Sequence, residues 1–255
     1  MVDELYLQSP LLSRAGFRHA FFTRSGGVSV GPYRSLSFSV AAGDDPAHVA
    51  ENRQRAAAAL GVREDRLYYL SQVHGVQLRQ VVGDEDPRAV LEWEGDALLS
   101  TASHVACGVR SADCVPVLIG DRSSGAACAV HAGWRGVAAR IVPKTLEALT
   151  ARLPGARFVV AIGPHISLDA FEVDAEVAEA LARSCSAPEV ASDRWPKPHV
   201  DLRRILRSQL EETGLEASSI DDVHGCTVND PARFFSFRRD GKLSGRHLSA
   251  IVPLG

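Results

Sequence analysis

VPVLIGDRSSGAACAVH, residues 115–131, is the stretch of sequence that decides the fold class of this chain. Its two ends are short apolar runs, and its centre, Asp121 to Gly125, consists of turn residues, so the stretch predicts two consecutive strands. Residues 136–153 follow with a helical apolar stripe of Val142, Leu146, Leu149 and Leu153. Strands in a run followed by a helix favour an α+β fold with mixed sheets over a strict β-α-β alternation.

Apolar runs on both sides of this stretch complete the predicted secondary structure. Strand-like runs lie at residues 67–70, 77–82, 97–99, 105–110, 158–162, 222–226, 233–237 and 247–252. Helices are predicted at residues 47–60, 136–153, 172–182 and 201–213. Asp45 and Pro46 supply a cap and a first turn for the first of these helices. Because no internal repeat, low-complexity segment or long linker interrupts the chain, we expect one domain over residues 1–255.

Composition and charge exclude several classes of protein. Of the 255 residues, 45% are hydrophobic and 23% are charged, which excludes a disordered chain. A formal net charge of -3 provides no bulk attraction for nucleic acid or for an anionic membrane, so neither partner is expected. No run of 18 apolar residues and no signal-peptide pattern is present. Five cysteines form no disulfide framework and favour a reducing compartment, so we expect a cytoplasmic protein.

Three separate segments carry the residues that chemistry requires, namely SQVHG (71–75), SADCVPVL (111–118) and HAGWRG (131–136). Each places a possible metal ligand at the end of a predicted strand, where a rigid scaffold can direct it into a cleft. One thiolate and two neutral imidazoles, from His74, Cys114 and His131, suit Zn²⁺ with an open fourth position. Their separation along the chain matches no zinc-finger pattern, so a buried cysteine with two structural histidines remains the alternative.

The third segment, HAGWRG (131–136), is also a candidate site for an anion. Its glycines allow close approach of the backbone, and it opens a predicted helix, so Arg135 together with the helix N-terminus makes a candidate site for phosphate or carboxylate. Trp134 offers a flat surface for a planar ligand, although a tryptophan at such a position is more commonly part of the core. The residues alone leave both interpretations open.

Taken together, these motifs resemble the YfiH/YlmD family, also known as laccase-domain or multicopper polyphenol oxidase proteins. The resemblance rests on QVHG (72–75), ADCVPVL (112–118) and HAGWRG (131–136), and it extends over roughly residues 15–252. Further matching segments are TRSGGVS (23–29), ENR (51–53), DAL (96–98), GP (163–164), FEV (171–173), CT (226–227), FFSFRRDG (234–241) and GR (245–246). Phe237 stands where the family usually has tyrosine, so that hydroxyl group is missing here.

The resemblance implies a fold, a metal site and an activity. The implied fold is a four-layer α/β/β/α arrangement with mixed sheets, related to the catalytic domain of cytotoxic necrotizing factors. The implied metal ligands are His74, Cys114 and His131, with Zn²⁺ as the resident ion. The implied activity is phosphorolysis of adenosine, inosine, guanosine and methylthioadenosine, together with hydrolytic deamination of adenosine. The expected partners are therefore purine nucleosides and phosphate, bound by a monomer or a small homo-oligomer.

Functional residues can be assigned on this basis. Cys114, Asp113 and Arg135 are the expected catalytic residues, with Asp113 or Asp96 as the candidate proton shuttle. Phosphorolysis also needs cations that hold phosphate. We expect the substrate and phosphate to be bound by Arg24, Asn52, Arg135 and Arg238.

Other activities stay open as alternatives. Cys114 and His131 could instead form a Cys–His hydrolase, and some family members have a peptidoglycan-editing role. A copper-dependent polyphenol oxidase is less favoured, because such enzymes need several coppers and many paired histidines. This chain has nine histidines, none of them two residues apart, and Met1 is its one methionine. Cu²⁺ could still occupy the Cys/His/His site in vitro, because it outcompetes Zn²⁺ for such ligands.

Overall fold

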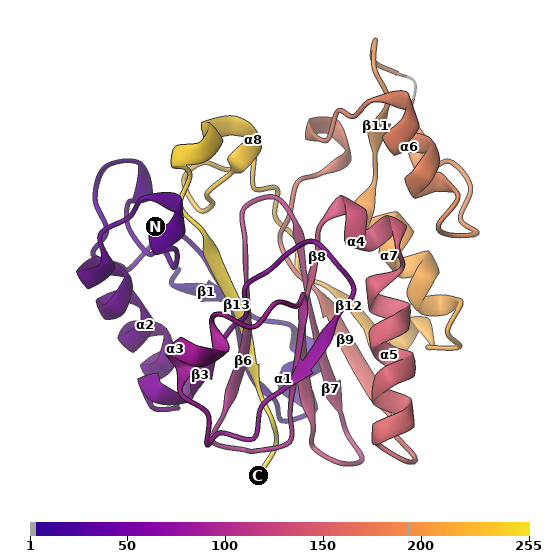
Figure 1. Ribbon diagram of the computed structural model, residues 1–255. Coiled ribbons are helices and arrows are strands. Elements are labelled where there is room, and N and C mark those ends of the chain that lie inside the picture. Colours follow the sequence, from indigo (N-terminus) through magenta and orange to yellow (C-terminus); the bar gives the residue numbers. More distant parts are fainter. Residues whose placement is uncertain (1–3, 193) are drawn as a thin grey trace.

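Two mixed sheets form the centre of the computed structural model, which describes residues 4–192 and 194–255 (Figure 1). The five-stranded sheet has the order β1 (Tyr6–Leu7), β2 (Arg18–Phe22), β13 (His247–Val252), β6 (Ala106–Ser111) and β3 (Leu67–Tyr68). The six-stranded sheet has the order β12 (Ile220–Asp222), β9 (Phe158–Ile162), β7 (Val115–Asp121), β8 (Ala127–Ala132), β5 (Ala97–Ser100) and β4 (Leu78–Gln80). A separate short pair joins β10 (Ala191–Ser192) to β11 (His199–Val200).

Both large sheets mix parallel and antiparallel pairs. In the five-stranded sheet β3 and β6 are parallel and the other pairs are antiparallel. In the six-stranded sheet the outer pairs β12–β9 and β4–β5 are parallel and the central pairs are antiparallel. The predicted α+β class with mixed sheets is therefore confirmed. The C-terminal strand β13 lies between β2 and β6, so the two ends of the chain meet in one sheet.

The central hairpin β7–β8 follows the sequence pattern closely. Val115 pairs with Ala132 at one end and Gly120 with Ala127 at the other. At the closed end the Asp121 carboxylate accepts hydrogen bonds from the backbone N–H groups of Ser123 and Ser124, which fixes the turn. Because both strands are buried on both faces, their side chains read as continuous apolar runs.

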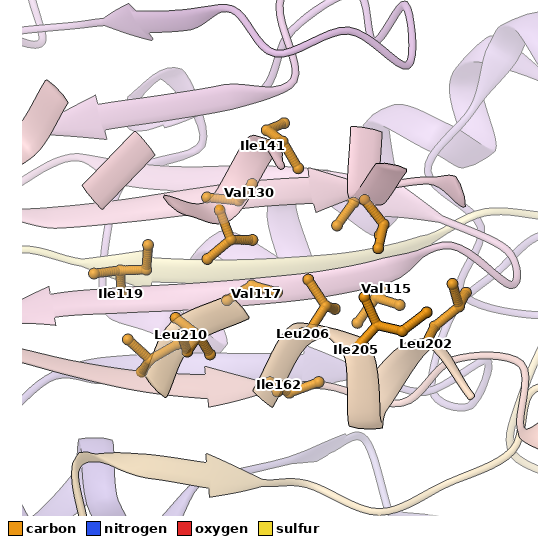
Figure 2. Close-up of a cluster of buried hydrophobic side chains, with 14 of the residues drawn as sticks. Val115, Val117, Ile119, Val130, Ile141, Ile162, Leu202, Ile205, Leu206 and Leu210 are labelled. Atoms are coloured by element: carbon orange, nitrogen blue, oxygen red, sulfur yellow. The ribbon is translucent and has the colours of Figure 1, made fainter. Parts of the chain in front are cut away.

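Three buried hydrophobic clusters hold these elements together. Figure 2 shows the first, in which strands of the six-stranded sheet pack against α5 (Ile141–Arg152) and α7 (Leu202–Glu211). The second lies between the sheets and includes Leu118 and Ile251, whereas the third packs the five-stranded sheet against α2 (Pro46–Leu60). Each fully buried leucine or isoleucine contributes about 1.5–3 kcal/mol relative to exposure.

The remaining helices are short: α1 (Pro10–Arg14), α3 (Pro87–Val90), α4 (Trp134–Ala138), α6 (Ala175–Ala182) and α8 (Phe237–Asp240). In α2 the predicted N-terminal cap is confirmed, because Asp45 accepts from the Ala47 N–H, and Gly61 ends the helix in a left-handed conformation. None of the helices in the described part of the chain combines the length and apolar character that a bilayer-spanning segment needs.

Three sequence-based expectations need correction. The strand predicted at residues 222–226 is displaced, because β12 ends at Asp222 and Cys226 forms an isolated bridge with His165. The helix predicted at residues 136–153 is broken into α4 and α5 at Arg140, which adopts a left-handed conformation with φ 60°. Its guanidinium bonds the Ser184 carbonyl and Glu212, and these distant contacts hold the break. The strand predicted at residues 233–237 is absent; Ser236 instead caps α8 by accepting from the Arg239 N–H. Distant contacts decide the break at Arg140, and a single capping hydroxyl decides the helical turn of α8.

Candidate metal centre

His74, Cys114 and His131 come together at one end of the six-stranded sheet. His74 lies in the loop between β3 and β4, Cys114 directly precedes β7, and His131 lies near the end of β8. One ligand atom from each residue lies within 4.8 Å of the others. The Sγ of Cys114 is 3.9 Å from Nε2 of His74, and the two imidazole rings meet edge to face with centroids 5.0 Å apart. The hairpin and a neighbouring loop thus bring together residues that are distant in the sequence.

A buried carboxylate, Asp96, bonds the ring of His131 and the backbone of the His74 loop. Its Oδ1 lies 2.8 Å from Nδ1 of His131, which leaves Nε2 as the free ring nitrogen of that residue. The same carboxylate accepts hydrogen bonds from the backbone N–H groups of Val73, His74 and Gly75. Burial raises the pKa of Asp96, but its bonds to His131 and to these N–H groups outweigh that effect and lower it. Asp96 therefore lies behind the candidate ligands, in contact with His131 and with the backbone of the His74 loop.

The thiol and His131 influence each other strongly. Burial raises the pKa of the Cys114 thiol, but the positive charge of His131 and hydrogen bonds from both histidines lower it to about 6. Burial lowers the pKa of His131, but the charge of Cys114 and the bond to Asp96 raise it to about 9. The thiolate is the form in which cysteine binds a metal or attacks an electrophile, and this environment favours it at neutral pH.

The backbone around the cluster has unusual conformations and a glycine that let the side chains of His74 and Cys114 come close together. His74 and Asp113 have positive φ angles of 60° and 91°, which residues other than glycine rarely adopt. A Cβ atom at position 133 would lie 2.6 Å from Cδ2 of His74 and 3.3 Å from Sγ of Cys114. Glycine at position 133 therefore lets the two side chains approach each other.

A cleft of about 550 Å³ opens onto the cluster, which is a volume typical of small-molecule sites. His74, Cys114 and His131 all line it. Two aromatic rings, Phe171 and Phe237, also face it, and Phe237 is 48% exposed although it is large and apolar. Three arginines complete the charged lining: Arg110, Arg238 and Arg246. The cleft can therefore present a soft metal site, flat apolar surfaces and several cations to one ligand.

Asp113 lines the cleft, but its carboxylate is occupied. It accepts hydrogen bonds of 2.6 Å from the Thr227 hydroxyl and from the Arg238 backbone N–H. The side chain therefore fastens the segment around α8 over the cleft. Arg238 also lines the cleft, and its guanidinium bonds the backbone carbonyl of Glu172 at 2.9 Å.

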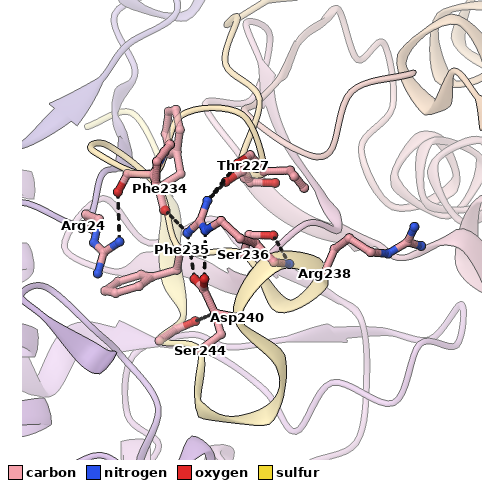
Figure 3. Close-up of polar contacts among 12 residues, drawn as sticks. Arg24, Thr227, Phe234, Phe235, Ser236, Arg238, Asp240 and Ser244 are labelled. Carbon is pink, nitrogen blue, oxygen red and sulfur yellow. Dashed lines mark hydrogen bonds and ion pairs between the residues drawn. The ribbon is translucent and has the colours of Figure 1, made fainter. Parts of the chain in front are cut away.

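The other three residues expected to bind substrate or phosphate lie outside this cleft. Arg24 bonds the carbonyl groups of Arg34 and Pro231. Figure 3 shows that the side chain of Arg238 extends away from Arg24. The side chain of Arg135 is exposed and lies over the Trp134 ring at 4.4 Å. Asn52 is fully buried, and its amide bonds backbone and hydroxyl groups of residues 28–37. These contacts give Asn52 a structural role in that loop.

Arg110 and Arg246 were not selected from the sequence as site residues. Arg246 belongs to the GR pair that matched the family, which was a signal, whereas Arg110 ends a predicted strand and carries no local signal. Both reach the cleft because β6 and β13 are neighbours in the five-stranded sheet. Cys107 and Cys128 are both buried in the apolar clusters.

Comparisons with known proteins agree with this architecture. Residues 18–253 match the family model described as multi-copper polyphenol oxidoreductase laccase. A purine nucleoside phosphorylase of Pseudomonas aeruginosa is 40% identical over 246 residues, which cover 93% of each chain. The purine nucleoside phosphorylase YfiH of Escherichia coli is 36% identical over 230 residues, which cover 90% of each chain.

A solved structure gives the same result for the fold. The crystal structure of YlmD from Geobacillus stearothermophilus superposes with a TM-score of 0.91 at 30% identity and covers 99% of this chain and 100% of that one. The resemblance that the sequence motifs indicated is thereby confirmed.

Proposed function

This chain belongs to the laccase-domain family that includes YfiH and YlmD, and from that premise we propose that it is a metal-dependent purine nucleoside phosphorylase. The observation that carries the proposal is the cleft in which His74, Cys114 and His131 lie beside arginines and aromatic rings. Cations suit the phosphate, aromatic faces suit the purine, and the relatives that share the chain's length carry this activity in their names.

The residues present fit a divalent metal ion. A thiolate and two imidazoles are the donor set that Zn²⁺ takes at catalytic sites with an open position, and Asp96 supplies the carboxylate behind a ligating histidine. Zn²⁺ is therefore the proposed ion, and Cu²⁺ fits the same donors in vitro. When bound, such an ion supplies Lewis-acid polarisation of an oxygen or nitrogen atom of the substrate.

The chain's own residues account for binding and orientation. Phe171 and Phe237 face the cleft and can hold a purine by its flat faces. Arg238 lies at the same mouth, over the Phe171 ring at 5.6 Å, where it offers a cation to the ligand. Because Thr227 and the Arg238 N–H already engage the Asp113 carboxylate, we assign Asp113 to holding the α8 segment in place.

The proposal extends to the substrates, to a second reaction and to the layer arrangement of the fold. We propose adenosine, inosine, guanosine and methylthioadenosine as substrates, with hydrolytic deamination of adenosine as a second reaction in the same cleft. We also propose that the chain forms a single domain with four α/β/β/α layers, which the three buried clusters support. The relation to cytotoxic necrotizing factors stays a prediction of the sequence resemblance.

A Cys–His hydrolase is the second candidate. The observation that favours it is the Cys114 thiol, whose pKa of about 6 beside His131 would also suit a nucleophile. Peptidoglycan editing would be a function of this kind. A multicopper oxidase is disfavoured, because the described residues contain one cluster of possible metal ligands and not the several that a multicopper site needs.

Product analysis separates these functions. Protein purified without added copper is incubated with adenosine or inosine, with and without phosphate. Free purine that forms only with phosphate supports phosphorolysis, and inosine formed from adenosine without phosphate supports deamination. If neither product forms while alkylation of Cys114 abolishes an amidase activity, the hydrolase account replaces this one.

A further inference from the structure

Two cleft arginines lack the partners that buried cations normally have. Arg110 donates to the Leu70 carbonyl and lies over the Tyr69 ring at 4.6 Å. Arg246 donates to the carbonyl groups of Ser244 and Gly245. Across residues 4–192 and 194–255, neither guanidinium has a carboxylate within 4.0 Å. Carbonyl groups satisfy some of their donors, and the negative charges of Cys114 and Asp113 act on Arg246, but neither residue bonds its guanidinium.

Arg53 provides the contrast within the same neighbourhood. Its guanidinium lies over the same Tyr69 ring at 4.9 Å, but it has an ion pair with Glu64 at 2.6 Å. Burial lowers the pKa of Arg110, and the positive charges of Arg53 and Arg246 lower it further. Arg110 and Arg246 are thus close enough to repel each other, and an anion between them would relieve that repulsion.

The cleft offers no free carboxylate of its own for this purpose. Asp113 lines it, but the Thr227 hydroxyl and the Arg238 N–H already bond both of its oxygen atoms. A bound anion would therefore add negative charge, which Asp113 and Cys114 supply to Arg246 only in part. Arg246 and Arg110 line the cleft together with Cys114, so an anion held there lies within reach of the candidate metal centre.

A second hollow also leads to this place. It has a volume of about 910 Å³ and lies between α2 and α3 over the five-stranded sheet. Ala41, Ser71 and Arg110 line both hollows, so Arg110 stands at their boundary.

We propose that Arg110 and Arg246 form the binding site of the phosphate co-substrate, in place of Arg24 and Arg135. The assignment rests on the proposed phosphorolysis. In that reaction a phosphate oxygen forms a bond to C1′ of the pentose, while the bond from C1′ to the purine nitrogen breaks. The electron pair of the broken bond leaves with the purine, which takes up the proton of hydrogen phosphate. Two guanidinium groups hold the phosphate oxygens and offset their charge during this transfer.

The test uses Arg246→Met, Arg246→Lys and Arg110→Met, with Arg183→Met as the control. Arg183 is an arginine whose side chain is 71% exposed and which pairs with Glu179 on the surface of the molecule. Loss of a charge-assisted bond predicts that the KM for phosphate rises roughly tenfold or more in both methionine variants. The KM for inosine changes little, and Arg246→Lys recovers part of the affinity for phosphate.

A second readout needs no turnover. Inorganic phosphate should raise the unfolding temperature of the wild-type protein and of Arg183→Met, because a ligand that binds the native state stabilises it. The Arg246 and Arg110 methionine variants should lose this rise. If Arg110→Met does not fold, the two Arg246 variants still decide the question, because the Arg246 guanidinium bonds carbonyl groups of its own loop and lies over the Phe237 ring at 5.6 Å, with no ion pair among the described residues.

The outcomes separate this inference from the proposed function. If wild-type protein releases no purine in the presence of phosphate, the proposed function fails, and the temperature shift alone judges the anion site. If the wild type carries out phosphorolysis but the methionine variants keep its KM for phosphate, the assignment of Arg110 and Arg246 is overturned. The same holds if phosphate stabilises the variants as much as it stabilises the wild type.

Discussion

Asp96 and Asp121 are two buried aspartates at opposite ends of the six-stranded sheet, and they serve different purposes with the same chemistry. Both are almost fully buried, and both accept several backbone N–H groups. Asp121 closes the β7–β8 turn and ties it to Arg157. Asp96 holds the His74 loop and in addition bonds Nδ1 of His131.

The difference shows how a structural device becomes part of a functional site. At the Asp121 end the carboxylate bonds only backbone and serine groups, so its effect ends with the stability of the turn. At the Asp96 end the same kind of carboxylate bonds the backbone N–H of His74 and the ring Nδ1 of His131, and both histidines line a cleft. We therefore expect substitutions at the Asp96 end to change metal binding and activity, and those at the Asp121 end to change stability alone.

The largest effect on kcat/KM is expected for Cys114, and Cys128 in the same hairpin provides the control. Cys114→Ser removes the proposed thiolate ligand and should lower kcat/KM by more than roughly a hundredfold. Cys128 lies within β8 in the apolar core, where burial raises its pKa and keeps it a neutral thiol. Cys128→Ala should cost about 1 kcal/mol of stability and leave kcat/KM unchanged. Equal activity of Cys114→Ser and wild type in a phosphorolysis assay would contradict the contrast.

Replacing each of the two aspartates by asparagine tests the comparison itself. Asp96→Asn should weaken metal affinity roughly 10- to 100-fold, because the carboxylate behind a ligating histidine is lost. Asp121→Asn should leave metal affinity unchanged and lower the free energy of unfolding by about 1–3 kcal/mol. Metal titration with a chelator competitor and urea unfolding measure the two effects. The account fails here if Asp121→Asn lowers metal affinity as much as Asp96→Asn does.

A fall in pH should first lower the free energy of unfolding through buried histidines outside the candidate metal centre. Burial lowers the pKa of His165 and of His247 to about 3, although each accepts or donates one backbone hydrogen bond. A histidine with a depressed folded pKa contributes stability above its unfolded pKa near 6.5 and loses it as the pH falls toward 3.

Each of these histidines should therefore lower the free energy of unfolding by about 1.4 kcal/mol per pH unit below 6.5. Asp96 and Asp121, whose pKa values are lowered, keep their contribution until the pH falls below the ordinary range of a carboxylate. Urea unfolding at pH 7 and at pH 5 checks this window. A free energy that stays constant between those two values would count against neutral buried histidines.

The smallest effect should come from two phenylalanines. Phe237→Ala removes an exposed ring at the cleft mouth and should raise the KM for the nucleoside roughly 2- to 10-fold. Phe158 pairs with Asp121 at the other end of the sheet, so Phe158→Ala should change stability and leave this KM unchanged. Steady-state kinetics on inosine measure both, and an unchanged KM in Phe237→Ala would remove that ring from the binding surface.

The sequence was most informative where local patterns decide structure. The β7–β8 hairpin and helix α2 followed from apolar runs, turn residues and caps, because these signals act within a few residues. The break at Arg140 and the helical turn at Phe237 did not follow, because contacts with distant residues or a single capping hydroxyl decide them.

The candidate site was predictable only in part. His74, Cys114 and His131 stood out as chemically unusual residues beside strand ends, and the structure brings them together. Arginine carries no such signal, because the chain contains many, and only the pairing of β6 with β13 brings Arg110 and Arg246 into the cleft. Arg24 and Arg135 looked equally suitable in the sequence, but their side chains lie elsewhere.

Metal content measured by elemental analysis tests the central claim most directly. Wild-type protein purified without added metal should carry about one zinc ion per chain. Cys114→Ser should carry far less, and Cys128→Ala should match the wild type. The account would be contradicted if folded wild-type protein carried no stoichiometric metal and still released purine with phosphate at full rate.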